Sequence, residues 1–300
     1  MAACEGRPGG ISLAGPSGAA MFAYRHQFHA GGVADVFKHA VLSRLVLALA
    51  RKPKPFFVLD THGGVGRYDL AHAWSEKTGE WRAGIGRIWE RTDAPEALLP
   101  YLDAVRAENR DGRLARYPGS PLIARRLMRP GDRLAVCELN ADDRAALEAS
   151  LSGLRDTAVH GMDGFQAVRA MLPPKERRGL VLIDASFDQA DEFGRIERAL
   201  ADAMRRFRTG IVAIWHPLMA ADDMAAFYDR LRAMALPETL RLELATHAPD
   251  WRAFRPGSGM IVVNPPWGLE DEAPPLLDWL WRALAPEAAG GVVVERLVAA

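Results

Sequence analysis

Short apolar runs alternate with helical patterns along most of the chain, and this alternation restricts the fold more than any other feature. Runs such as Phe56–Asp60 and Leu180–Asp184 are rich in aliphatic side chains and bounded by polar ones, which is typical of a buried strand. The segment Val33–Arg51 instead repeats apolar residues at helical spacing. Strands that alternate with helices favour an α/β fold with a doubly wound, mainly parallel sheet.

The elements can be placed by residue range. The predicted strands are 56–60, 133–138, 157–160, 180–184, 210–215, 240–245 and 259–264, and the helices between them are 33–51, 141–154, 164–172, 193–207 and 220–235. No helical pattern separates the last two strands, so we predict that the last strand is antiparallel.

One interval, 67–130, is longer than a single crossover helix requires. It contains helical patterns at 75–91 and 94–108, so we predict an inserted helical subdomain there. Residues 1–20 are rich in Gly, Ala and Pro and are expected to be a disordered N-terminal extension. The remaining residues, 21–300, are expected to form one domain that carries the insertion.

Composition excludes several functional classes. The only two cysteines, Cys4 and Cys137, cannot build a disulfide framework or a cysteine zinc site. His26 and His29 have no suitable third metal ligand nearby in the sequence. The sequence has no apolar run of about 18 residues, and its formal net charge is +0 at pH 7, so any nucleic-acid surface must be local. We expect a cytoplasmic monomer without a metal or a membrane partner.

Acidic residues follow four consecutive predicted strands, namely Asp60, Glu138, Asp163 and Asp184. The carboxyl ends of parallel strands meet at one edge of a sheet, where such folds bind ligands. A glycine-rich loop at 63–66 follows the first strand and allows close approach of a ligand. Each acid alone is better explained as a helix N-cap, and the loop alone as a plain turn. Together they indicate a pocket for S-adenosylmethionine with its reactive edge at Asp184.

Longer segments resemble the RlmJ family, the bacterial 23S rRNA adenine N6-methyltransferases that are also described as proteins for the use of external DNA. The matching segments are YRHQFHAGGVADVFKHAVL (24–42), FFVLDTHGGVGRYDL (56–70), TGEW (78–81), RYPGSPLIARRLM (116–128), CELN, DGF, RRGLVLID (177–184) and SGMIVVNPPW (258–267). The resemblance covers nearly all of 21–290. It implies a class I methyltransferase domain over 21–300 with an inserted helical subdomain, S-adenosyl-L-methionine as cofactor and 23S rRNA as partner.

The resemblance also implies roles for individual residues. It places Tyr24 and His26 at the target adenine and makes Asp184 the catalytic acceptor. The implied cofactor contacts are Lys38, His39, His62, Ser120, Glu138, Asp163 and Gly164.

The tetrad Asp184-Ala185-Ser186-Phe187 stands where adenine N6-methyltransferases usually carry Asp-Pro-Pro and an aromatic residue. The Asp184 carboxylate and the Ala185 carbonyl can still accept the two N–H bonds of an adenine amine, and Phe187 can stack on the extruded base. The stiffness of two prolines is lost, so we expect the same reaction with less preorganisation. Asn264-Pro265-Pro266-Trp267 matches the usual pattern better but follows the last strand, so we interpret it as structural.

Two functions remain open on sequence grounds. The first is methylation of a specific adenine in 23S rRNA, and the second is non-catalytic or DNA-directed nucleic-acid binding in external DNA utilisation. Retention of Asp184 and Phe187 favours the first. The segment 112–130 contains only basic charges, which predict either a surface that holds RNA phosphates or a solvated helix face. These are Arg113, Arg116, Arg125, Arg126 and Arg129.

Overall fold

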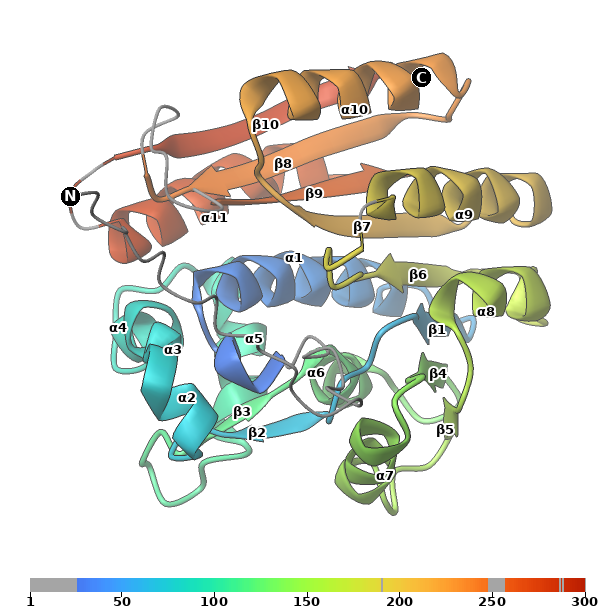
Figure 1. Cartoon of the computed structure of the whole chain (residues 1–300). Helices are drawn as coiled ribbons and strands as arrows, with labels where there is room; N and C mark the ends of the chain where they lie inside the picture. The colour runs from blue at the N-terminus through green and yellow to red at the C-terminus, as the bar shows by residue number, and fades with distance from the viewer. Residues whose placement is uncertain (1–25, 190, 248–256, 286, 288, 300) are drawn as a thin grey trace, which may run out of the picture.

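The computed structural model describes the chain except for residues 1–25, 190, 248–256, 286, 288 and 300, so Tyr24 and the expected N-terminal extension lie outside the described residues. Its centre is an eight-stranded sheet in the order β10-β8-β9-β7-β6-β1-β4-β5 (Figure 1). The strands are β1 (Phe57–Asp60), β4 (Arg133–Cys137), β5 (Thr157–His160), β6 (Gly179–Ile183), β7 (Ile211–Pro217), β8 (Thr239–Ala245), β9 (Gly257–Val263) and β10 (Gly291–Val298).

The strand directions confirm a mainly parallel sheet whose last strand is antiparallel. Strands β5, β4, β1, β6 and β7 run parallel to one another. Strand β9 is antiparallel to both β7 and β8, and β10 is antiparallel to β8. The sequence prediction ends at 264 and misses both β10 and the helix before it, α11 (Leu269–Leu284).

Helices cover both faces of the sheet. On one face lie α8 (Gly164–Met171), α9 (Glu192–Arg206) and α10 (Ala221–Ala233), whose apolar residues share a core with the sheet. The other face carries α1 (Val33–Ala50), α6 (Ser120–Leu127), α7 (Ala141–Ser150) and α11. This doubly wound arrangement is the one that the alternation of strands and helices predicts.

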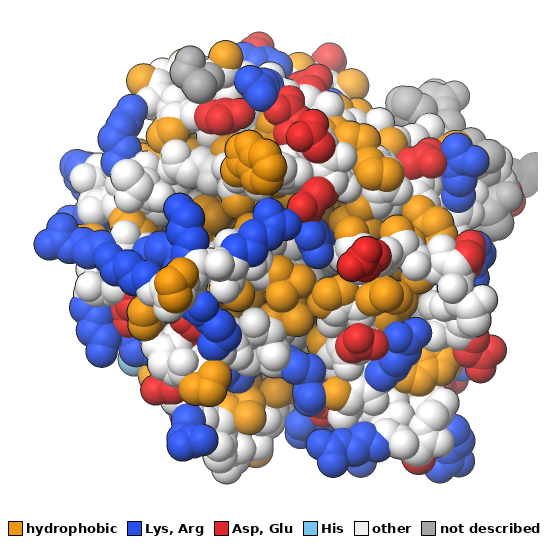
Figure 2. All heavy atoms as spheres, turned by 180° about the vertical axis from the view of Figure 1, so that it is seen from behind, with side chains coloured by type: hydrophobic (Ala, Val, Ile, Leu, Met, Phe, Trp, Pro, Cys, Tyr) orange, Lys and Arg blue, Asp and Glu red, His pale blue; other side chains and the backbone are white. Residues whose placement is uncertain are grey.

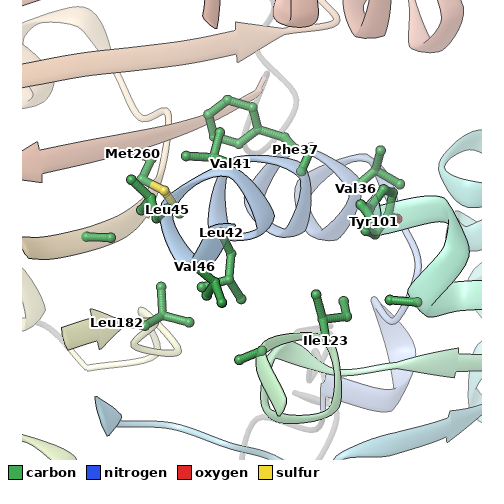
Figure 3. Close-up of a cluster of buried hydrophobic side chains, with 14 of the residues drawn as sticks. Val36, Phe37, Val41, Leu42, Leu45, Val46, Tyr101, Ile123, Leu182 and Met260 are labelled. Atoms are coloured by element: carbon green, nitrogen blue, oxygen red, sulfur yellow. The ribbon is translucent and has the colours of Figure 1, made fainter. Parts of the chain in front are cut away.

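Helix α1 is buried on nearly all sides, not along one stripe. Figure 3 shows it between side chains of the sheet, such as Leu182 and Met260, and side chains of neighbouring helices, such as Tyr101 and Ile123. A helix that is apolar all round is a buried helix. Polar residues of α1 are therefore buried with it, and they include Asp35, Lys38 and His39.

The interval 67–130 is mainly helical, but its helices are shorter than predicted. Gly79 takes the left-handed conformation at φ 63°, which ends the first of them. Two short strands pair as an antiparallel ribbon that the sequence analysis did not predict. The elements are β2 (Arg67–Asp69), α2 (Ala73–Thr78), α3 (Glu80–Ala83), α4 (Ile85–Ile88), η2 (Glu96–Leu98), α5 (Leu99–Arg106) and β3 (Arg116–Pro118). Among the described residues, no helix is long and apolar enough to cross a membrane.

Candidate active site

The four acidic residues singled out in the sequence come to one edge of the sheet. Asp60 ends β1, and its register places it beside Val136 of β4 and Leu182 of β6. Glu138 and Asp184 directly follow β4 and β6, and Asp163 caps α8 just beyond β5. Parallel pairing therefore gathers these carboxylates at the carboxyl ends of the strands, as expected for a ligand site.

The glycine loop is tied to the end of β4. The Gly64 N–H donates a hydrogen bond to Glu138 Oε2 at 3.0 Å, and the Asn140 N–H donates to Glu138 Oε1 at 2.8 Å. A Cβ at Gly63 would lie 2.2 Å from a methyl group of Val136, so the loop passes too close to β4 for a side chain there. Burial raises the pKa of the half-buried Glu138. Both hydrogen bonds use its lone pairs only partly, so a hydroxyl ligand can still donate to it.

The Asp184 carboxylate belongs to a buried charge chain. Lys38 Nζ lies 2.6 Å from Asp184 Oδ2 and 2.9 Å from Asp35 Oδ1. Asp35 also contacts His26 Nε2 at 2.9 Å. Burial alone would lower the pKa of Lys38, but the two carboxylates raise it above its ordinary value. Lys38 therefore stays protonated beside Asp184.

The loop after Asp184 is held by aromatic contacts. Phe187 adopts a left-handed backbone conformation with φ 54°. Its ring meets Phe193 at 5.1 Å and Trp215 at 5.8 Å between centroids, both edge-on. Ser186 Oγ donates a 2.6 Å hydrogen bond to Asp188. The tetrad without prolines is thus restrained by side chains.

Comparison with known proteins assigns this site to a family. Residues 53–298 match the family model described as Ribosomal RNA large subunit methyltransferase D, RlmJ. The chain is 42% identical over 276 residues to Ribosomal RNA large subunit methyltransferase J of Haemophilus influenzae. The aligned residues are 92% of this chain and 98% of that protein. The chain belongs to the RlmJ family. This membership confirms the expected class I methyltransferase fold and S-adenosyl-L-methionine as cofactor.

Two further relatives agree in length and shape. Ribosomal RNA large subunit methyltransferase J of Escherichia coli is 41% identical over 278 residues, which are 93% of this chain and 99% of that protein. The crystal structure of LPL1258 from Legionella pneumophila superposes with a TM-score of 0.82 at 32% identity. That alignment covers 89% of this chain and 97% of the other.

Two cofactor residues expected from the RlmJ resemblance have side chains that already hold other protein groups. Ser120 Oγ donates to Asp60 Oδ2 at 2.7 Å, and Lys38 is bonded to Asp184 and Asp35. Asp60 is 1% exposed, and burial, opposed by the Ser120 hydrogen bond, raises its pKa to about 6. Ser120 and Lys38 therefore support the acidic edge, and their contact with the cofactor stays a prediction.

The two histidines of the predicted pocket are buried in different ways. His39 is fully buried, and its Nδ1 lies 2.7 Å from the Tyr117 hydroxyl. His62 Nδ1 lies 2.7 Å from Thr61 Oγ1, and its ring meets Phe165 edge-on at 5.3 Å. Burial lowers the pKa to about 3 for His39 and to about 4 for His62. Both rings are neutral near pH 7, and their contact with the cofactor also stays a prediction.

The side chains of Arg125 and Arg129, two of the five arginines of the segment 112–130, hold other parts of the protein. Arg125 donates to the Asp132 and Arg129 carbonyls at 2.8 Å, and Arg129 donates to the Ala50 and Lys52 carbonyls. Asp132 directly precedes β4, so these guanidinium groups tie loops together at the edge where the parallel strands begin, opposite Asp184. In Figure 2, Lys and Arg side chains gather at the left of the face seen from behind. Arg125 and Arg129 thus have a structural role, and phosphate contacts by the segment stay a prediction.

Several residues of the edge escape sequence reasoning. Asp35 and Trp215 lie in apolar patterns of α1 and β7, where nothing marks them as neighbours of Lys38. Leu139 is 64% exposed, and its position directly after Glu138 is the only signal that the sequence offers for it. Asn264 is structural as expected, because its Nδ2 donates to the Arg208 and Gly210 carbonyls before β7. Among the described residues, no cluster of three metal-ligand side chains occurs.

Proposed function

We propose that this protein transfers a methyl group from S-adenosyl-L-methionine to the N6 amine of a specific adenine in 23S rRNA. The observation that carries the proposal is the position of Asp184 beyond β6, paired with the protonated Lys38 and followed by Phe187. A carboxylate that is paired with a cation and followed by an aromatic residue suits an extruded adenine. The names of the Haemophilus influenzae and Escherichia coli relatives support ribosomal RNA as the substrate.

The strand ends fit the cofactor. A Cβ at Gly164 would lie 2.1 Å from the Thr61 carbonyl oxygen, so only glycine lets the start of α8 pack against the residue after β1. The half-buried Glu138 carboxylate would accept hydrogen bonds from the ribose hydroxyls. The exposed Leu139 side chain offers an apolar contact for the adenine ring. We assign the amino-acid end of the cofactor to the side near the glycine loop, His62 and Ser120.

The chain's own residues orient the substrate. An adenine amine is a weak nucleophile because its lone pair is delocalised into the ring. Hydrogen bonds to the Asp184 carboxylate and the Ala185 carbonyl would turn that lone pair towards the methyl group, which the bound cofactor supplies on a sulfonium. Lys38 Nζ donates to Asp184 Oδ2 at 2.6 Å and so orients the carboxylate that would accept an N–H. Positioning of this kind supplies most of the catalysis when the leaving group needs no assistance.

The substrate side of the site includes His26 and Tyr24. His26 is anchored by Asp35 at 2.9 Å, and its ring lies 5.2 Å from the ring of Tyr68. Tyr24 lies outside the described residues, and its role at the target adenine is what the resemblance implies. We further infer that the protein acts as a monomer in the cytoplasm, where its rRNA substrate is made.

The test is labelled methyl transfer from S-adenosyl-L-methionine to naked 23S rRNA, assembled large subunits and duplex DNA in parallel. We expect label in rRNA, at adenine N6 after digestion to nucleosides. Glu138→Ala should weaken cofactor binding in calorimetry by about 1–3 kcal/mol, because ribose hydroxyls lose their acceptor. Asp222→Ala, which alters an exposed carboxylate on α10, is the matched control. Label only in DNA would redirect the proposal to a DNA enzyme, and cofactor binding without any transfer would support the non-catalytic alternative.

A further inference from the structure

We propose that Arg195 is a positioning residue that links the cofactor pocket to the substrate loop, defined as residues 184–189. The inference rests on the proposed function, because it takes Asp163 as a cofactor contact and Asp184 as the acceptor of the adenine amine. Arg195 lies in the first turns of α9, which follows the substrate loop. Its guanidinium group contacts both sides of the candidate site.

On the cofactor side, Arg195 fixes the Asp163 carboxylate. Asp163 Oδ1 accepts the Gln166 N–H at 3.0 Å and thereby caps α8, while Oδ2 accepts Arg195 Nη2 at 2.9 Å. The guanidinium carbon of Arg195 lies 4.5 Å from the centre of the Phe165 ring. Two bonds from different directions leave the carboxylate one orientation, and each oxygen keeps a lone pair for a ligand.

On the substrate side, the same guanidinium group holds the loop. Arg195 Nη1 donates to Gln189 Oε1 at 2.9 Å and to Glu192 Oε1 at 3.3 Å. Gln189 belongs to the substrate loop, and Glu192 is buried at the start of α9. Burial raises the pKa of Glu192, and the positive charge of Arg195 opposes that rise. One side chain therefore connects the turn after β5 with the loop after β6.

The substrate loop needs such a restraint in this chain. Ala185 and Ser186 stand in place of two residues whose rings would fix the backbone, so more conformational freedom must be removed when the loop orders. Phe187 in addition holds a positive φ, which persists only when its surroundings enforce it. The bonds Ser186–Asp188 and Arg195–Gln189 supply this enforcement.

The geometry also explains why an arginine serves here. Its planar group presents donors in several directions and stacks on an aromatic ring, whereas a lysine offers one compact charge. The side chain is 27% exposed and lines a hollow of about 230 Å³ between α8 and α9. Arg198 lines the same hollow one turn later, but among the described residues its only ion-pair partner is the exposed Asp191. Arg198 is thus the matched control.

The experiment compares Arg195→Gln with Arg198→Gln in the full-length protein. Cofactor affinity is measured by calorimetry, and kcat and KM by labelled methyl transfer to 23S rRNA. We expect Arg195→Gln to weaken cofactor binding and to lower kcat by about tenfold each, a size typical of losing a charge-assisted bond. Arg198→Gln should change both by less than about twofold. Gln189→Ala, which leaves the Asp163 contact intact, should lower kcat without changing cofactor affinity.

A double-mutant cycle tests the link itself. Arg195→Gln combined with Asp163→Asn should be non-additive for cofactor affinity, and combined with Gln189→Ala it should be non-additive for kcat. A lower melting temperature for Arg195→Gln with unchanged affinity and kcat would reduce Arg195 to a structural ion pair. The link would also be overturned if Arg195→Gln lost only cofactor affinity and kept its kcat, while Gln189→Ala stayed fully active. Failure of the wild type to bind cofactor or transfer methyl groups would instead overturn the proposed function, before any variant is compared.

Discussion

His216 offers a measurable pH dependence at the carboxyl end of β7, one residue after Trp215. It lies in β7 with no exposed surface, between the rings of Phe227 and Tyr228 at 5.6 and 5.8 Å. Its Nδ1 lies 3.1 Å from the Pro217 carbonyl oxygen, while Nε2 has no partner among the described residues. A proton added at Nε2 would have no acceptor, and burial lowers the pKa of His216 to about 4.

The direction and the magnitude of the change in stability with pH follow from this lowered pKa. Above about pH 6.5 the ring is neutral in both states, and His216 contributes no pH dependence. As the pH falls from about 6.5 to about 4, His216 binds a proton in the unfolded chain but stays neutral in the folded protein. The free energy of unfolding therefore decreases. A pKa lowered from 6.5 to about 4 corresponds to a loss of about 3 kcal/mol in the free energy of unfolding at low pH. About 2 kcal/mol of this is lost by pH 5.

The assay is denaturant unfolding at about pH 7.5 and pH 5, followed by circular dichroism, for the wild type and His216→Phe. Phenylalanine keeps a flat ring and removes the titration, so the variant should lose about 2 kcal/mol less than the wild type between the two conditions. His39 and His62 titrate in both proteins in the same direction, and Asp60 in the opposite direction, so they cancel in the comparison. His72→Asn, at an exposed ring that caps α2, is the control. An equal loss in wild type and His216→Phe would refute the reasoning.

Further predictions concern the site itself. Gly164→Ala should lower the melting temperature, because the new Cβ would meet the Thr61 carbonyl at 2.1 Å; an unchanged melting temperature would contradict the close packing. Asp184→Ala should abolish methyl transfer and preserve cofactor affinity, with Asp184→Asn milder; a fully active Asp184→Ala would remove the mechanism. Ala185→Pro should lower the melting temperature, because Ala185 is 2% exposed and leaves little room for a ring; an unchanged melting temperature would contradict this tight packing.

The sequence by itself determined the framework and the place of the site. Strand and helix periodicities are local properties, so the parallel sheet and most of its helices could be predicted from short windows. The acids Asp60, Glu138 and Asp184 come together because parallel strands share one carboxyl edge, whatever the packing elsewhere. The tetrad at 184–187 could be recognised as altered because its chemistry depends on its own residues.

The helices of 67–130 show where local reasoning stops. The patterns at 75–91 and 94–108 predict two longer helices, but the chain breaks them into shorter pieces at Gly79 and elsewhere. These pieces are held by packing against α1 and α11, which a local window does not contain. The assignment of this interval as an insertion stays a prediction.

Only the tertiary structure decided which side chains meet at the edge. Lys38 and Asp184 are separated by 146 positions, yet their charges form the shortest link of the buried chain that continues to Asp35 and His26. The apolar pattern of α1 gives no sign that Lys38 would be buried, because burial there requires both the sheet and α11 to close around the helix. Likewise, five arginines in one segment suggest a phosphate surface. Only the folded structure shows that Arg125 and Arg129 donate to backbone carbonyls. Charge pairing depends on distances in space, and those exist only once the chain has folded.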